Sequence, residues 1–125
     1  MSLDVALYGE YREEKCMCPH CDHSHTRNIR EKLYESNITH NLNTMAEAAG
    51  IYYALWRPEA VGYKKARQLI DPLTIGLNLL KSDPERFKIF NAKNGWGAYK
   101  DLVLFVEKYL SACEQHPDAD VVASR

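Results

Sequence analysis

The longest regular apolar pattern in the chain predicts one amphipathic helix in its second half. Apolar residues recur there at helical spacing on one face, which a globular protein buries. They are Ala66, Leu69, Ile70, Leu73, Leu77 and Leu80. Asp71-Pro72 interrupts the stripe, either as a kink or as a cap followed by a proline in the first turn of another helix. Because the stripe keeps its phase across Pro72, we favour one kinked helix.

Three shorter segments also carry helix signals. Their expected ranges are 37–50, 83–90 and 98–114. Asn37 or Thr39 can cap the free amides of the first of these helices, and Gly50 is placed to end it. Residues 51–56 could add another turn, which should stop where Pro58 forces Arg57 out of helical geometry.

Alternating apolar and polar residues predict strands at both ends of the chain. Leu3, Val5 and Leu7 share one face of a strand over residues 3–11. Residues 29–36 can return as the second strand of a long hairpin, and residues 119–125 can close the sheet against 3–9. These strands require one small antiparallel sheet.

Together these elements predict an α+β fold in a single domain, residues 1–125. A small antiparallel sheet, made of an N-terminal hairpin and a C-terminal strand, would pack with about four helices. The net charge of −1 argues against nucleic acid as a partner. Neither a secretory leader nor an apolar run long enough for a bilayer is visible, so we expect a cytoplasmic protein without membrane contact.

A cysteine- and histidine-rich stretch, residues 16–25, is expected to form a zinc-knuckle-like loop at the tip of the hairpin. Cys18 and Cys21 are separated by two residues, a spacing that lets two thiolates hold one tetrahedral ion. Cys16 and either His23 or His25 could complete the site locally. We therefore predict a structural Zn²⁺ held by Cys16, Cys18, Cys21 and His25.

Two alternatives to this local site stay open. Cys113 and His116, at the end of the last helix, could join Cys18 and Cys21 if the hairpin tip folded onto that end. Cys113 also lies on the apolar stripe of its helix, where a buried cysteine acts as a small hydrophobe, and we favour that role. The other alternative is a reduced loop without metal.

Three segments rich in polar and aromatic groups lie at element ends, where binding sites are commonly built. The candidate ligand-binding residues are Asn37, Thr39, His40, Asn41, Trp56, Arg57, Glu59, Asn94, Gly95, Trp96, Gly97 and Tyr99. Helix starts near Thr39 and Gly97 would offer amides to a phosphate or carboxylate. A flat ligand ring could stack on the tryptophans, and Arg57 could donate two parallel hydrogen bonds to an anion. We expect one concave pocket, although each residue also has a structural explanation as cap, core or ion pair.

Signals for catalysis are weak, and no catalytic residue is assigned. The chain has no G-x-S-x-G, H-E-x-x-H or G-x-x-x-x-G-K motif. A small hydrolase or nucleotide-processing enzyme with His40 as its base is the first alternative to a binding protein. A zinc-stabilised nucleic-acid-binding module is the second.

Several runs of this sequence resemble a family of small proteins encoded by phages and prophages. They are Asn37-Ile-Thr-His-Asn-Leu42, Leu55-Trp-Arg-Pro-Glu59, Asn94-Gly-Trp-Gly97, Pro117-Asp-Ala119 and Ser124-Arg125. The similarity covers nearly all of residues 30–125 and leaves out the cysteine loop. It implies a phage accessory protein in the host cytoplasm.

Small phage proteins without enzyme motifs often bind and block a host component. The resemblance therefore implies an inhibitor of a host defence system, with a host protein or an anionic or nucleotide signal as its partner. Self-association through the sheet or the knuckle is also expected.

Overall fold

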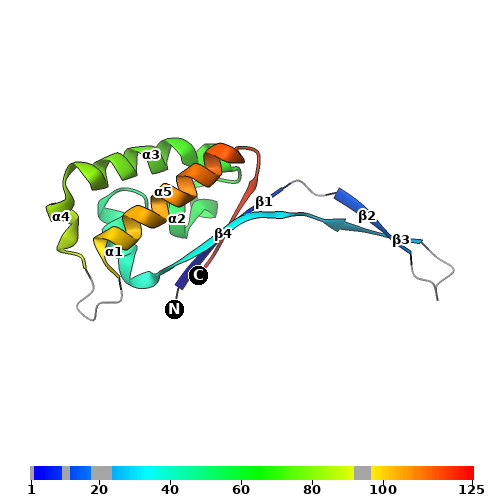
Figure 1. Ribbon diagram of the computed structural model, residues 1–125, viewed down its shortest axis with the longest axis horizontal. Helices are drawn as coiled ribbons and strands as arrows, with labels where there is room; N and C mark the ends of the chain where they lie inside the picture. The colour runs from blue at the N-terminus through cyan, green and yellow to red at the C-terminus, as the bar shows by residue number, and fades with distance from the viewer. Residues whose placement is uncertain (1, 10–11, 18–23, 92–96) are drawn as a thin grey trace.

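The computed structural model describes residues 2–9, 12–17, 24–91 and 97–125, with 12–17 and 24–29 described by their backbone alone. Three antiparallel strands form the main sheet, in the order β4-β1-β5. The central strand β1 (Ser2–Tyr8) pairs with β4 (Lys32–Thr39) on one side and with β5 (Asp120–Ser124) on the other. The predicted α+β fold is confirmed, and the two ends of the chain lie side by side in the sheet (Figure 1).

Strand β4 is longer than the sequence pattern predicted. It continues through Asn37 and Ile38 to Thr39, where a helix was expected to begin. Ile38 is buried and pairs with Leu3 of β1, which keeps this segment in the sheet. Thr39 is then the helix cap, because its hydroxyl accepts a hydrogen bond from the amide of Asn41 at 3.4 Å.

A second, two-stranded sheet lies beyond the ends of β1 and β4. Its strands, β2 (Arg12–Met17) and β3 (Ser24–Ile29), are antiparallel and extend away from the helices in Figure 1. The loop predicted over residues 16–25 is therefore shorter, because each strand takes two of its residues. The register places Cys16 opposite His25.

Four short helical segments follow β4. They are η1 (His40–Leu42), α1 (Asn43–Ala48), α2 (Tyr52–Trp56) and η2 (Pro58–Val61). As predicted, Gly50 follows α1 with a φ of 78°, a left-handed conformation that favours glycine. Arg57 has a φ of −138° and a ψ of 54°, so the residue before Pro58 does leave helical geometry.

The long apolar stripe forms one helix, α3 (Ala66–Ser82), which continues through Pro72. This confirms the single-helix prediction and excludes a break at Asp71. Helix α4 (Pro84–Lys88) begins on a proline as expected and stops short of Phe90.

Helix α5 (Tyr99–Gln115) packs against both α3 and β4, so the helices cover one face of the sheet (Figure 1). The core lies between these two layers and takes side chains from every long element. No helix among the described residues combines the length and the apolar character needed to cross a membrane.

Candidate functional site

Trp56 is the point at which two of the predicted segments meet. Its side chain is only 1% exposed, and its ring stacks on Tyr52 with centroids 5.8 Å apart. The indole Nε1 donates a hydrogen bond to Nδ1 of His40 at 2.9 Å. Residues 37–41 and 55–59 are therefore in contact, as the sequence predicted. Trp56 itself is sealed in the core and cannot stack a ligand ring.

The contact with Trp56 determines which nitrogen of His40 carries a proton. Because Nδ1 accepts the indole hydrogen bond, the neutral ring has its proton on Nε2. Nε2 is buried and has no hydrogen-bond partner among the described residues. His40 therefore presents no free lone pair to a substrate in this arrangement.

Arg57 lies on the surface beside two tyrosines, which we call the tyrosine–arginine surface (Tyr52, Tyr53 and Arg57). Arg57 Nε donates a hydrogen bond to the Tyr52 hydroxyl at 3.2 Å. This bond raises the pKa of Arg57 above its ordinary value. Tyr53 is 54% exposed and packs edge-on against Tyr52, with centroids 5.3 Å apart. The charged guanidinium of Arg57 and the exposed ring of Tyr53 therefore lie close together at the surface, each in contact with Tyr52.

Glu59 has its partner within the chain. Arg125 Nη1 donates to Glu59 Oε1 at 2.7 Å and to the backbone carbonyl of Trp56 at 2.9 Å. The hydrogen bond from Arg125 lowers the pKa of Glu59 below its ordinary value. Glu59 was predicted as a ligand-binding residue, but in the structure it anchors the C-terminal residue of the chain to η2.

Gly97 and Tyr99 are the predicted residues of the third segment that the structure describes. A Cβ at this position would lie 3.0 Å from Thr39 Cγ2 and 3.1 Å from Leu42 Cγ, so Gly97 packs directly against the start of η1. The segments around Thr39 and Gly97 therefore do meet. Asn94, Gly95 and Trp96 lie outside the described residues.

The start of α5 is not the open anion site that the sequence suggested. The amide of Ala98 donates to Asp101 Oδ2 at 3.1 Å, and the amide of Tyr99 donates to Asn91 Oδ1 at 2.7 Å. Asp101 also brings a negative charge to this end of the helix, which repels an anion. The Tyr99 hydroxyl donates to the carbonyl of Leu80, so Tyr99 ties α5 to α3.

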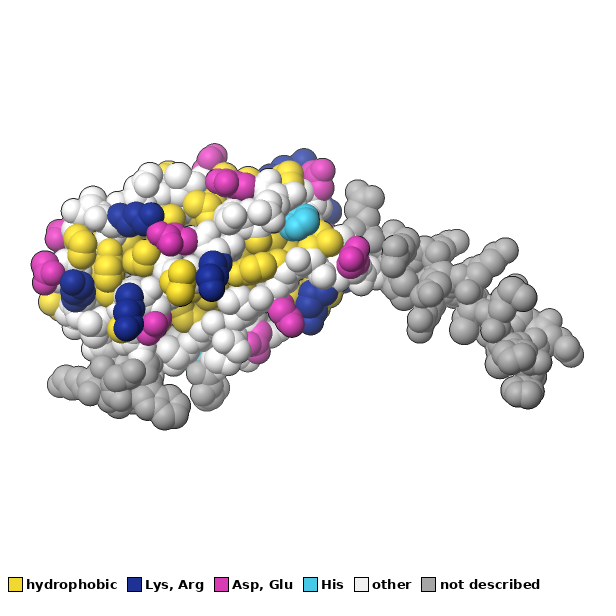
Figure 2. Space-filling model, in the orientation of Figure 1, with side chains coloured by type: hydrophobic (Ala, Val, Ile, Leu, Met, Phe, Trp, Pro, Cys, Tyr) yellow, Lys and Arg dark blue, Asp and Glu magenta, His cyan; other side chains and the backbone are white. Residues whose placement is uncertain are grey.

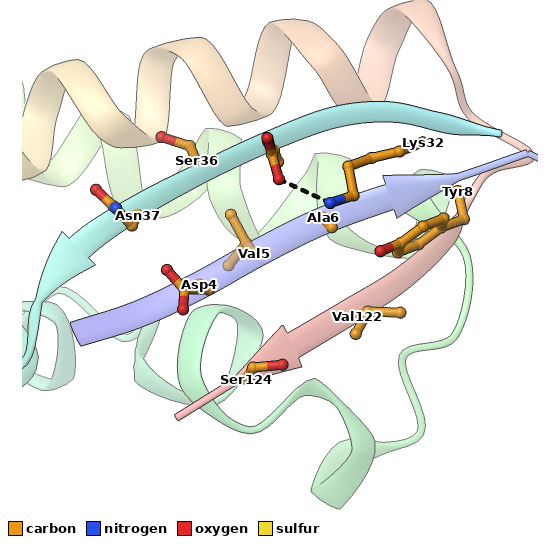
Figure 3. A pocket seen from close by; sticks show the side chains of 10 residues that line it. Asp4, Val5, Ala6, Tyr8, Lys32, Ser36, Asn37, Val122 and Ser124 are labelled. Atoms are coloured by element: carbon orange, nitrogen blue, oxygen red, sulfur yellow. Dashed lines mark hydrogen bonds and ion pairs between the residues drawn. The ribbon is translucent and has the colours of Figure 1, made fainter. Parts of the chain in front are cut away.

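Asn37 belongs to a different surface, the face of the sheet turned away from the helices. A hollow of about 640 Å³ lies there, and Figure 3 shows its lining side chains on the three strands with the helices behind. Asn37 faces Asp4 across the β1–β4 pair. Lys32 Nζ, which pairs with Glu35 at 2.8 Å, lies 5.8 Å from the centre of the Tyr8 ring. Asn37 also lines a groove between β4 and α5, together with Thr39 and Gly97. The predicted single pocket is thus divided among this hollow, that groove and the region around Trp56.

The described residues contain no group of three or more metal-binding side chains. Of the predicted zinc ligands, Cys16 and His25 lie in β2 and β3, whereas Cys18, Cys21 and His23 lie outside the described residues. The alternative site with His116 requires Cys113 as a ligand. Cys113 is completely buried in the core, so the hydrophobic role predicted for it is the one the structure supports.

Cys113 is expected to be unreactive in the folded protein. Burial, together with the nearby Glu114 carboxylate, raises the pKa of the Cys113 thiol to about 12. The thiolate is the reactive form, so alkylation should be very slow at neutral pH and should accelerate only as the pH rises towards that value. Peptide mapping after brief alkylation would show Cys113 protected in native protein and labelled after denaturation. Equal labelling in both states would contradict its burial.

Tyr52, Tyr53 and Arg125 are the site residues that the sequence analysis missed. Tyr52 and Tyr53 precede Trp56 in a five-residue helix, and one turn does not show which aromatic side chain faces outward. The ion pair between Arg125 and Glu59 spans 66 residues. Its only sequence signal was that both residues belong to runs that resemble a family of phage proteins.

Comparison with known proteins adds no assignment, since no protein-family model, curated protein or solved structure matches the chain.

Proposed function

We propose that the chain is a non-enzymatic accessory protein of a phage or prophage that binds and blocks a protein of the host's defence. The observation that carries this proposal is the tyrosine–arginine surface. Tyrosine and arginine are enriched among the residues that dominate the energy of protein–protein interfaces. Here Tyr53 is more than half exposed, and Tyr52 holds the Arg57 guanidinium in position beside it.

A protein partner fits this surface better than the nucleotide signal that the sequence also suggested. Recognition of a nucleotide needs a ring platform and donors that converge on a phosphate. Trp56 is buried, and the first amides of α5 are used by Asn91 and Asp101. What remains exposed among the described residues of this surface is one tyrosine ring beside one guanidinium, without converging backbone amides, and this suits an acidic and aromatic patch on another protein.

The state of His40 supports binding rather than hydrolysis. A general base needs a free lone pair within reach of the proton that it removes. In His40 one ring nitrogen accepts the indole hydrogen bond, and the other is buried and protonated in the neutral ring. The alternative hydrolase would have to break the contact with Trp56 before its base could act.

The proposed function is tested by a phage infection assay. Expression of the chain in a bacterium that carries a defence system sensitive to it should restore plaque formation by a phage that the system normally blocks. Arg57→Ala should lose most of this effect, because a charge-assisted contact contributes about 1.5–3 kcal/mol to binding.

Arg67→Ala is the matched control for this assay. Arg67 is also an exposed arginine. It pairs with Asp118, which precedes β5, whereas Arg125, the partner of Glu59 beside Arg57, follows β5. It should behave as wild type. Equal plaque formation with wild type and Arg57→Ala, or failure of the wild type in every defence system tested, would count against the proposal.

We also propose that the tip of the β2–β3 hairpin holds a structural zinc ion. A two-stranded hairpin is by itself only marginally stable in water, so an additional constraint at its tip is expected. The register supports a local site because Cys16 and His25 are directly paired in the β2–β3 ladder. With Cys18 and Cys21 between them in the sequence, all four ligand positions would be filled by protein, as in structural sites.

Elemental analysis of protein purified without added zinc should find about one zinc per chain. Cys16→Ser should lower this content, whereas Cys113→Ser should not, because Cys113 is buried in the core. Protein with no metal and with freely reactive Cys16, Cys18 and Cys21 would exclude the site.

A further inference from the structure

Besides the larger hollow on the open face of the sheet, a groove between β4 and α5 is a surface feature that the proposed function does not use. Its volume is about 470 Å³. Its lining on the strand side is residues 36–39, and its lining on the helix side is Gly97, Asp101, Leu104, Phe105 and Lys108. The helix residues recur every three or four positions, so one stripe of α5 faces the groove.

Each wall of the groove exposes groups that can contact another chain: backbone groups on one wall and an apolar side chain on the other. Within the described chain, β4 pairs with β1 along one edge, and no strand pairs with the other edge. An open strand edge is a template for pairing with another chain. On the opposite wall, the Leu104 side chain is 50% exposed. Figure 2 shows hydrophobic side chains exposed among charged ones over the face that carries α5.

The two charges of the groove are opposite in sign and lie at its two ends. Asp101 and Lys108 are seven residues apart, which is two helical turns or about 10 Å along the axis. Leu104 and Phe105 lie midway between them. Lys108 has no ion-pair partner among the described residues, and Asp101 accepts only the amide of Ala98. The helix and the strand run in opposite directions, because Gly97 lies against Thr39 and Tyr109 stacks on Tyr34.

This arrangement is complementary to itself under a two-fold rotation. An axis through the middle of the groove, perpendicular to the sheet, would place β4 antiparallel to β4 of a second copy. It would also place α5 antiparallel to α5 of that copy on the same side of the joined sheet. Asp101 of each copy would then face Lys108 of the other, with the two Leu104 side chains at the axis. Paired contacts of this kind are typical of isologous interfaces.

We propose that the chain forms a two-fold dimer in which a second copy occupies this groove, with the β4 edges paired and the α5 helices side by side. Charge complementarity identifies the occupant, since only a partner with the reversed order of charges satisfies both ends at once. The chain itself has that order when it is turned by the two-fold axis. Tyr52, Tyr53 and Arg57 do not line the groove, and the dimer does not depend on the proposed function.

Sedimentation equilibrium of the full chain tests the dimer. Wild type should give twice the chain mass of 14.4 kDa. Lys108→Glu should raise the dimer dissociation constant roughly tenfold or more, because two attractive pairs become two repulsive ones. Lys100→Glu, the same change of charge on the same helix, should not affect dimerisation, since Lys100 does not line the groove.

A charge exchange makes the test specific. Asp101→Lys should also weaken self-association, but a mixture of Asp101→Lys and Lys108→Glu chains should form the heterodimer, in which both pairs are attractive again. Because Asp101→Lys also removes the cap on Ala98, Leu104→Glu serves as a second variant that leaves the cap intact and should give monomer. Wild-type protein that remains monomeric, which would leave the groove for an extended segment of another protein, would overturn the proposal. Equal dimerisation by Lys108→Glu and Lys100→Glu would do the same.

Discussion

Replacing Trp56 with alanine is expected to lower the free energy of unfolding by about 3–5 kcal/mol, the range for loss of a large core aromatic. The side chain is almost completely buried. It stacks on Tyr52 and donates a hydrogen bond to His40, which joins α2 to the start of η1. Urea denaturation followed by far-ultraviolet circular dichroism measures the loss without relying on tryptophan fluorescence.

The contribution of the Trp56–His40 hydrogen bond to stability can be measured separately from the contribution of ring packing. His40→Ala leaves the buried indole N–H without an acceptor and should cost about 1–3 kcal/mol. In a Trp56→Phe background the same substitution should cost clearly less, because there is no indole N–H left to satisfy. Equal costs in both backgrounds would show that His40 does not stabilise the fold through this bond.

Gly76→Ala is expected to destabilise the protein by about 1–3 kcal/mol, the usual cost of forcing an extra group into a packed core. A Cβ on Gly76 would lie 2.1 Å from Cγ2 of Ile51 and 3.4 Å from the carbonyl oxygen of Ala49. Ile51 is completely buried and branched at Cβ, so its methyl group has no free space to enter. The clash should outweigh the gain of about 1 kcal/mol that alanine offers over glycine within a helix.

Asn78→Ala supplies the control for Gly76, because Asn78 is an exposed position on the same helix. It should leave stability unchanged or raise it slightly through helix propensity. The two variants are compared by the midpoint of chemical unfolding. A Gly76→Ala protein as stable as the Asn78→Ala protein would mean that α3 does not pack closely against residues 49–51.

Much of the fold follows from periodicity. The phase of the apolar stripe from Ala66 to Leu80 was enough to keep α3 in one piece across Pro72, and alternation around Val5 identified the central strand. Of the two caps considered, Thr39 is the one used, and the error at Asn37 and Ile38 has a physical cause. Asn37 is also a good helix cap, but pairing of residues 37–39 with residues 2–4 of β1 extends the strand to Thr39. That pairing links residues far apart in sequence, so local signals could not show it.

The candidate site was also predictable only in part, because local sequence signals show which segments are unusual but not which of their side chains are buried. Contact between the segments around His40 and Trp56 followed from their unusual composition. Burial of Trp56 and exposure of Tyr53 did not, because the five residues of α2 are too few to define a buried face. The capping of α5 by Asn91 and Asp101 was also missed, since either residue could equally have faced solvent.

Calorimetric titration of a purified host defence protein, chosen as one that the chain inhibits in the infection assay, tests the central claim most directly. Wild type should bind it with a measurable heat, and Arg57→Ala should bind roughly tenfold or more weakly. Arg67→Ala should match wild type. Equal affinities for wild type and Arg57→Ala, or competition of a nucleotide with the host protein, would contradict the proposal that the tyrosine–arginine surface binds a protein.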